Sequence, residues 1–241
     1  MTRKQKVLLG MSGGVDSSAA AFLLQEQGYA VEGITLRLRM DDTRSAGREQ
    51  PEAHGASGDI RDAALVAETL GIPHSVLDLR EEFQNRVISN FVQEYARGRT
   101  PNPCAVCNRF IKFGAMLEYA LSHGFDYIAT GHYANIIRQE TEKGPGRWLL
   151  KSVPSQKDQS YMLYSLSQKQ LSHTLLPLAG YTKEEIRSIA GSAGLPVAKK
   201  PDSQEICFVP DNDYIRFLEE YTGSKAPEGD FITKEGTVLG R

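Results

Sequence analysis

Strand-like and helix-like segments alternate over the first 135 residues of this 241-residue chain, and this alternation constrains the fold more than any other feature. Short β-type runs are expected at residues 6–9, 31–38, 75–79 and 127–130. Apolar residues recur at helical spacing between and around these runs, over residues 17–27, 60–70, 83–95 and 110–121. Strands separated by helices favour an α/β fold with a mostly parallel, doubly wound sheet covered by helices on both faces.

The regular alternation of strands and helices ends after residue 131, which predicts a second domain that is smaller, partly helical and incomplete. A hairpin is expected from residues 135–138 and 148–153, and helices from residues 167–171, 183–193 and 213–220. Residues 40–58, rich in Asp, Gly, Ser and Glu, are expected to form a long loop. These shifts predict three domains, at residues 1–137, 138–210 and 211–241.

Composition and charge exclude several classes of protein. Hydrophobic residues make up 40% of the chain and there are only 3 cysteines, which argues against disordered, collagen-like and disulfide-stapled chains. No apolar run approaches the ~18 residues of a membrane span, and no secretion signal is visible, so we expect a cytoplasmic protein with no membrane partner. The 28 basic and 30 acidic residues nearly balance, yet residues 138–200 hold 10 basic and 5 acidic ones. Such a local excess of positive charge favours the binding of phosphate groups.

The sharpest local signal is the segment from Gly10 to Ser18, Gly-Met-Ser-Gly-Gly-Val-Asp-Ser-Ser, between the first strand and the first helix. Gly13 and Gly14 leave room for backbone N–H groups to approach phosphate oxygens. The helix that follows directs its free N–H groups and the positive end of its dipole at the same place. The segment lacks the Lys of a Walker loop and the spacing of the dinucleotide fingerprint.

The cysteines form a second signal. Cys104 and Cys107 make a Cys-x-x-Cys pair behind two prolines and ahead of a predicted helix, amid Arg99, Arg109 and Lys112. Nearby cations and a helix N-terminus favour the thiolate. The third cysteine, Cys207, lies about a hundred positions further on.

The Gly10–Ser18 segment resembles the phosphate loop of the ATP pyrophosphatase (PP-loop) superfamily, whose members have the adenine nucleotide α-hydrolase-like fold. The chain as a whole resembles the tRNA-specific 2-thiouridylases, which place sulfur on C2 of the wobble uridine. Five blocks in the same order carry the resemblance, at residues 10–18, 100–113, 129–133, 157–161 and 199–208.

The resemblance implies a role for each block. ATP would be bound by Gly10, Met11, Ser12, Gly13, Gly14, Val15, Asp16, Ser17, Leu36 and Gly131. The Asp16 carboxylate would serve either Mg²⁺ or the chemistry on the pyrophosphate side. The target base would meet Asn102, Pro103 and Cys104, and the tRNA would also contact His132, Lys157, Asp158 and Gln159. Residues 1–137 would then be the PP-loop catalytic domain and residues 138–210 a basic tRNA-contacting extension. Topology supports Leu36 and Gly131 separately, since both lie near the carboxyl ends of predicted parallel strands.

In this chemistry ATP adenylates the uridine carbonyl, sulfur from a donor protein or sulfide replaces the oxygen, and AMP and pyrophosphate are released. Cys107 would be the nucleophile or resolving thiol, and Cys207 would carry sulfur as a persulfide. Many family members have Asp where Cys104 stands, so an aspartate-assisted mechanism does not transfer to this chain. Cys104, Cys107 and Cys207 could instead ligate a [4Fe-4S] cluster. Zinc is a weaker alternative, because a structural zinc site needs four ligands and no fourth ligand other than His132 is evident in the sequence.

Two other readings use the same loop. Another PP-loop adenylating ligase, acting on a small molecule, would leave the cysteines idle. A nucleotide-binding regulatory module would bind ATP without releasing pyrophosphate. The family normally continues into a longer central domain and a C-terminal β-barrel that grips tRNA. Residues 211–241 are therefore expected to be the truncated start of that central domain.

Overall fold

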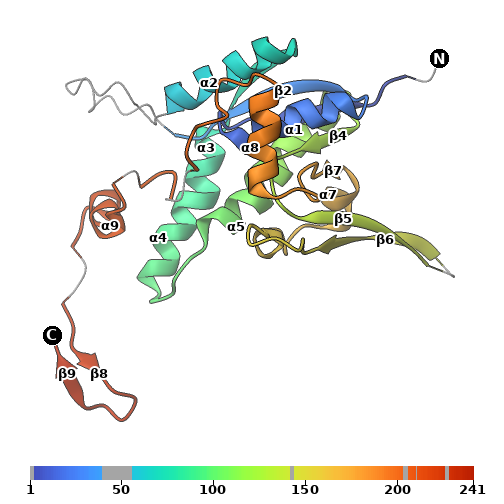
Figure 1. Cartoon of the computed structure of the whole chain (residues 1–241). Coiled ribbons are helices and arrows are strands. Elements are labelled where there is room, and N and C mark those ends of the chain that lie inside the picture. The colour runs from blue at the N-terminus through green and yellow to red at the C-terminus, as the bar shows by residue number, and fades with distance from the viewer. Residues whose placement is uncertain (1–2, 40–55, 142–143, 203–205, 210, 226–227) are drawn as a thin grey trace. The chain divides into compact units, whose positions relative to one another are not determined.

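The computed structural model describes residues 3–39, 56–141, 144–202, 206–209, 211–225 and 228–241 (Figure 1). The chain divides into two compact units, Met1–Asp202 and Ser203–Arg241. Most of the expected loop at residues 40–58 lies outside the described residues.

The first unit is built on a five-stranded sheet in the order β3-β2-β1-β4-β7, with every neighbouring pair parallel. Its strands are β1 (Lys6–Gly10), β2 (Ala30–Arg37), β3 (His74–Asp78), β4 (Tyr127–Ala129) and β7 (Thr174–Leu175). The predicted parallel α/β sheet is thus confirmed. The two-residue strand β7 was not expected, because so short a segment carries no periodic pattern of its own.

Three helices cover one face of the sheet: α1 (Val15–Glu26), α2 (Ala56–Leu70) and α8 (Lys183–Ser192). The central strand shows why two faces are covered, since Val7 and Leu9 join the core under these helices while Leu8 joins the opposite core. Figure 1 shows α1 and α8 side by side on this face. Helix α8, although far along the chain, therefore packs beside the helix that follows the first loop.

Two helical runs follow β3 in the chain, and each contains a π-helical segment. The first run comprises α3 (Arg80–Phe83), η2 (Gln84–Ile88) and α4 (Ser89–Ala96); the second comprises α5 (Pro103–Cys107), η3 (Asn108–Ala115) and α6 (Met116–Ser122). The second run packs Phe113, Met116 and Leu117 into the core beneath Leu8. Both helices were expected, but side-chain periodicity did not reveal the change of helical pitch.

The chain between β4 and β7 forms the expected hairpin, β5 (Asn135–Thr141) and β6 (Gly144–Lys151), followed by η4 (Ser160–Met162) and α7 (Gln168–Ser172). The second unit contains α9 (Tyr214–Thr222) and an antiparallel pair, β8 (Phe231–Ile232) and β9 (Val238–Gly240). The observed division after residue 202 differs from the expected boundaries at 137 and 210. The reason is that β7 joins the sheet and α8 packs on α1, which ties residues 138–202 to the first unit. Among the described helices, none combines the length and apolar character that a membrane span requires.

Candidate functional site

The loop between β1 and α1 is shaped by two glycines. Gly13 has a left-handed φ of 69°, and a Cβ there would lie 2.5 Å from the carbonyl oxygen of Asp59. Gly14 precedes α1 as its N-cap and has no side chain with which to cap the helix. The first-turn N–H groups of this 12-residue helix therefore stay open to an anion.

The sheet order places this loop at a crevice. The chain leaves β1 toward β2 and β3 on one side, and returns to form β4 on the other side of β1, so the order reverses between β1 and β4. Ligands of open α/β sheets bind at such a switch point. Gly131 follows β4, and a Cβ there would lie 2.8 Å from both the carbonyl carbon of Asp16 and the nitrogen of Ser17. The structure thus brings Gly131 and the Gly10–Ser17 loop together, and Leu36 lies near the carboxyl end of the adjacent strand β2.

The loop serines differ in availability. The backbone N–H of Ser12 donates to Ser17 Oγ at 3.2 Å, and the Ser17 hydroxyl donates to the carbonyl of Gly14 at 3.2 Å. Ser18 is fully buried and donates to the same carbonyl at 2.8 Å. Ser12 is exposed. Ser12 is therefore the hydroxyl best placed to meet a ligand, while Ser17 and Ser18 hold the loop.

Asp16 is fixed by two residues that the sequence analysis did not assign to the site. The Tyr133 hydroxyl donates to Asp16 Oδ1 at 2.7 Å, and Lys183 Nζ lies 2.7 and 2.8 Å from the two carboxylate oxygens. Burial, together with the hydrogen bond to the Asp16 carboxylate, raises the pKa of Tyr133, so its hydroxyl remains a donor at neutral pH. The carboxylate is thereby held in one orientation at the start of α1.

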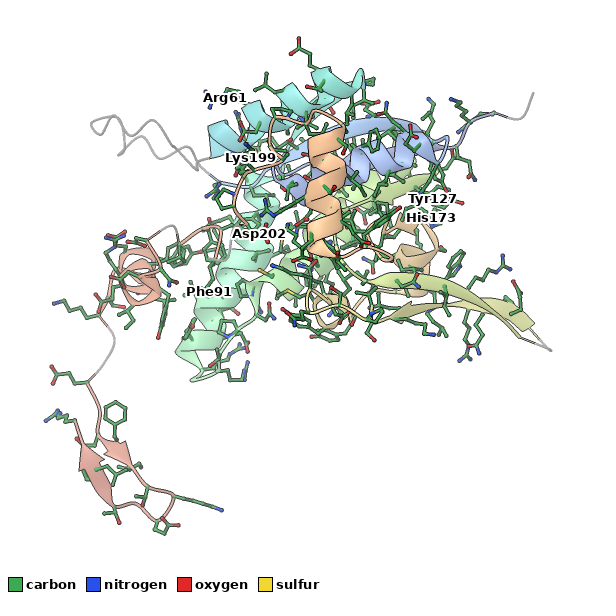
Figure 2. All side chains as sticks on the ribbon, in the orientation of Figure 1. Arg61, Phe91, Tyr127, His173, Lys199 and Asp202 are labelled. Atoms are coloured by element: carbon green, nitrogen blue, oxygen red, sulfur yellow. The ribbon has the colours of Figure 1, made fainter. Side chains whose placement is uncertain are left out.

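The ammonium of Lys183 continues the network to Asp202, at 2.7 Å from Oδ1. Asp202, marked in Figure 2, also accepts from Arg187 on α8 and from Lys157, each at 3.0 Å. Burial opposes ionisation of Asp202, but hydrogen bonds from Lys183 and Lys157 lower its pKa below the ordinary value. Asp202 is therefore a carboxylate at neutral pH.

One sequence signal could have revealed Lys183. It is the first residue of α8, directly after the N-cap Thr182, which forms a capping box with Glu185. The helix dipole disfavours a cation at this position, so a buried lysine there needs acidic partners elsewhere in the fold.

A second lysine ties the same region to α2. Lys200 Nζ donates to the carbonyl of Gly13 at 3.1 Å and contacts Asp59 at 3.1 Å and Asp62 at 2.7 Å. Burial disfavours its charge, but the hydrogen bonds to Asp62 and Asp59 raise the pKa of Lys200 overall. The segment after α8 is thus attached directly to the phosphate loop.

The Cys-x-x-Cys pair lies on α5, at the start of the second helical run. Asn102 caps this helix by accepting from the N–H of Ala105 at 3.0 Å, and Pro103 occupies its first turn. Cys104 is exposed and Cys107 is buried. The charge expected from Arg99 is engaged elsewhere, because its guanidinium pairs with Glu94 at 2.5 Å.

His132, expected to contact tRNA, lies just after β4. Its Nδ1 is 2.8 Å from Thr130 Oγ1, and its ring centroid is 5.8 Å from that of Phe113. Burial, with a smaller effect of the Lys112 charge, holds the pKa of His132 well below its ordinary value. The imidazole is therefore neutral at pH 7.

All three consecutive residues expected to meet tRNA make internal contacts, and Lys157 donates to Asp202 at 3.0 Å. Asp158 accepts from the N–H of Val153 at 2.9 Å and from the Ser160 hydroxyl at 2.6 Å. The side-chain oxygen of Gln159 accepts from the N–H of Tyr133 at 3.0 Å. These bonds hold the turn against the site, and the tRNA contacts of Lys157, Asp158 and Gln159 stay predictions.

Cys207 lies in a turn of the second unit, whereas Cys104 and Cys107 belong to the first. Within the described part of residues 3–202, no three His, Cys, Asp or Glu side chains gather as a metal-binding group. A site that joins the three cysteines therefore stays a prediction. Binding of a divalent cation at the Asp16 carboxylate also stays a prediction, and both oxygens of this group lie within 2.8 Å of Lys183 Nζ.

The contact of Gly131 with α1 predicts that Gly131→Ala destabilises the fold by about 1–3 kcal/mol, because a methyl group would press on backbone atoms that cannot rotate away. Gly180→Ala is the matched control, since a Cβ at Gly180 meets nothing within 4 Å. Urea unfolding followed by circular dichroism measures both variants. Equal stability of the two would contradict the contact.

Burial of neutral His132 predicts a specific pH dependence of stability. Its folded pKa lies below the value of about 6.5 expected for the unfolded chain, so the unfolded state binds the proton more readily. Stability should therefore fall as the pH drops below about 6.5, and fall less in His132→Asn. Urea unfolding at pH 7.5 and 5.5 tests this, and the same loss in both proteins would refute it.

Comparisons with known proteins show to which family the chain belongs. The curated relative tRNA-specific 2-thiouridylase MnmA of Lachnoclostridium phytofermentans is 51% identical over 98% of this chain and 65% of its own length. The MnmA proteins of Acetivibrio thermocellus (51% identical, 99% of this chain and 66% of the relative) and Clostridioides difficile (47%, 100% and 65%) are similar to the same extent. The chain thus spans about 65% of the length of the curated relatives it matches. Residues 5–211 match the family model described as tRNA methyl transferase HUP domain, and the chain belongs to this family.

Proposed function

We propose that this chain carries out ATP-dependent 2-thiolation of tRNA: it adenylates the C2 carbonyl of the wobble uridine and replaces the oxygen with sulfur. The products are 2-thiouridine, AMP and pyrophosphate. The observation that carries the proposal is the identity of about 50%, over nearly the whole chain, to proteins named tRNA-specific 2-thiouridylase. The reaction belongs to the cytoplasm, where its tRNA substrate is found.

The phosphate loop supports the ATP half of the reaction. Its open N–H groups, the left-handed Gly13 and the close approach of Gly131 form a cradle that a single Cβ would obstruct. The phosphates of ATP suit these donors, and Mg²⁺ suits the oriented carboxylate of Asp16. Tyr133 and Lys183 keep that carboxylate in place.

The cysteines favour thiolation over the alternatives. A small-molecule ligase of the same loop class would have no role for Cys104, Cys107 and Cys207. Methyl transfer, the reaction in the description of the family, would have no role for a phosphate-binding loop. The exposed side chains of Asn102 and Cys104 at the start of α5 are accessible to a splayed-out base. His132, Lys157, Asp158 and Gln159 would line the path of the tRNA.

In the persulfide route, a donor protein supplies the outer sulfur of a Cys207 persulfide. That sulfur attacks C2 of the adenylated uridine and expels AMP. The Cys107 thiolate then attacks Cys207 Sγ, the bond to the transferred sulfur breaks, and its electron pair stays on the base as the thiocarbonyl. A Cys107–Cys207 disulfide remains, which an external thiol reduces before the next turnover.

The cluster route uses the same residues differently. Cys104, Cys107 and Cys207 would hold three irons of a [4Fe-4S] cluster, leaving one iron to bind sulfide. The presence of a third thiol at Cys104 makes this donor set available.

Anaerobic purification with iron and acid-labile sulfide analysis separates the two routes. The cluster route predicts about four irons per chain, with their loss in Cys104→Ser. The persulfide route predicts an iron-free protein that makes 2-thiouridine when given a persulfide donor. Iron bound equally by wild type and Cys104→Ser would rule out the three-cysteine cluster.

Substitutions should separate the ATP step from the sulfur step. Cys107→Ser and Cys207→Ser are expected to abolish 2-thiouridine formation while pyrophosphate release with tRNA largely survives. Asp16→Asn is expected to reduce pyrophosphate release by about 100-fold, because the cation loses its carboxylate. Nucleoside analysis of the tRNA and a pyrophosphate assay measure the two steps. Unchanged turnover in Cys207→Ser would favour the small-molecule ligase instead.

A further inference from the structure

Two exposed arginines share one exposed aromatic ring on the two helical runs that follow β3. Phe110, on η3, is 38% exposed. The guanidinium carbon of Arg109 lies over its ring at 4.9 Å from the centroid. The guanidinium carbon of Arg86, on η2 of the other run, lies over the same ring at 5.5 Å. We call these three residues the Arg–Phe–Arg cluster.

The cluster carries positive charge that its surroundings do not neutralise. Arg97 and Arg99, which lie nearby in the sequence, both pair with Glu94, at 3.4 and 2.5 Å. Among the residues that the structure describes, neither Arg86 nor Arg109 pairs with a carboxylate or donates a side-chain hydrogen bond. Two neighbouring guanidiniums therefore present their N–H donors to solvent.

The ring gives these guanidiniums a defined geometry. A guanidinium is a planar fork with its donors at the edge, and packing its face on an aromatic ring restricts a long side chain without using those donors. Part of the conformational entropy that a freely moving arginine loses on binding is therefore lost beforehand. The cluster is thus preorganised for an anion.

A phosphodiester group of a nucleic acid matches this arrangement. Its two free oxygens accept from the edges of guanidiniums, a pairing for which arginine is favoured over lysine. The exposed part of the Phe110 ring suits the flat face of a neighbouring base. An acidic protein would use the two cations but not the ring, so the combination favours RNA.

The place of the cluster in the fold connects it to the proposed reaction. Phe110 follows Cys104 by six positions along one helical run, about 9 Å at the rise of an α-helix. The segment η2, which carries Arg86, packs against α5, which carries Cys104. Figure 1 shows the run that ends in α4 beside α5. The cluster therefore lies on the same pair of helical runs as the residues proposed to meet the target base.

We propose that the Arg–Phe–Arg cluster binds the phosphate backbone of the tRNA close to the target nucleotide. Arg86 and Arg109 hold a phosphodiester group, while Phe110 fixes the two guanidiniums and offers its ring to a base. All three are positioning residues, because none of them meets the reacting atoms. This inference rests on the proposed function for the identity of the RNA.

The test measures the affinity of the full chain for tRNA by fluorescence anisotropy over a range of salt concentrations, without ATP. A double variant, Arg86→Gln with Arg109→Gln, removes both guanidiniums. Phe110→Leu removes the ring but keeps an apolar side chain. Arg3→Gln is the matched control for charge, because Arg3 is exposed and pairs with Asp126 next to the amino end of β1. Urea unfolding checks that each variant folds, and the single arginine variants serve if the double variant does not.

The double variant should bind tRNA about tenfold more weakly at about 0.1 M salt. The plot of log affinity against log salt concentration should become shallower by about 0.7–1, the share of one phosphate contact. Phe110→Leu should weaken binding by about threefold and leave this slope unchanged, because both charges remain. Arg3→Gln should match the wild type in affinity and slope.

The kinetics should show the same division. At saturating tRNA, the double variant should form 2-thiouridine at a rate within about twofold of the wild type, because the lost contact lowers affinity for the tRNA and its effect lies in KM. Arg109→Lys keeps the charge but not the planar fork, and should weaken tRNA binding by about threefold.

Equal affinity and equal salt dependence in the double variant and Arg3→Gln overturn the inference. It is also overturned if the double variant loses binding to fluorescent poly-glutamate while its tRNA affinity is unchanged, since the cluster would then belong to an acidic protein partner. Failure of the proposed function looks different: the wild type would form no 2-thiouridine, while the tRNA affinities would still separate the double variant from its control.

Discussion

The ion pair between Asp16 and Lys183 is the contact on which the site depends. It joins the first turn of α1 to the first turn of α8, two helices that pack side by side on one face of the sheet. The Tyr133 hydroxyl adds a third element, from the chain that follows β4. Without these partners the carboxylate could rotate toward the open N–H groups of its own helix and compete with an anion there.

The strand order of the sheet brings together the loops that surround this contact. Because β1 has β2 on one side and β4 on the other, the loops after β1 and β4 meet at one edge. Gly131 approaches the backbone of Asp16 so closely that no side chain fits between them. The cradle that we propose for an anion is therefore formed by the backbone that follows two strands, and the charged side chains hold the surrounding elements together.

Several site features followed from local sequence. The strand–helix alternation and the glycine-rich loop between β1 and α1 depend on neighbours in the chain and were predicted correctly. The cap that Asn102 forms on α5 was not predicted. The tRNA contacts expected for Asp158 and Gln159 rest on motif resemblance and stay predictions, and in the fold both side chains accept internal hydrogen bonds. Strand β7 is too short to show a pattern, and its place in the sheet depends on the register Ile128–Thr174 with β4.

By itself, the sequence determined the parallel sheet, the glycine-rich loop at the end of its first strand and the helix that follows the cysteine pair, because each depends on residues a few positions apart. It predicted a turn for the pair itself, which lies in helix α5. The tertiary structure decided the partners of Asp16, since Lys183 lies 167 positions away and its place at the start of a helix does not indicate which carboxylate it contacts. It likewise decided that residues 138–202 complete the first unit. Contacts of this kind follow from how helices pack on a sheet, a property of the whole chain that no local pattern encodes.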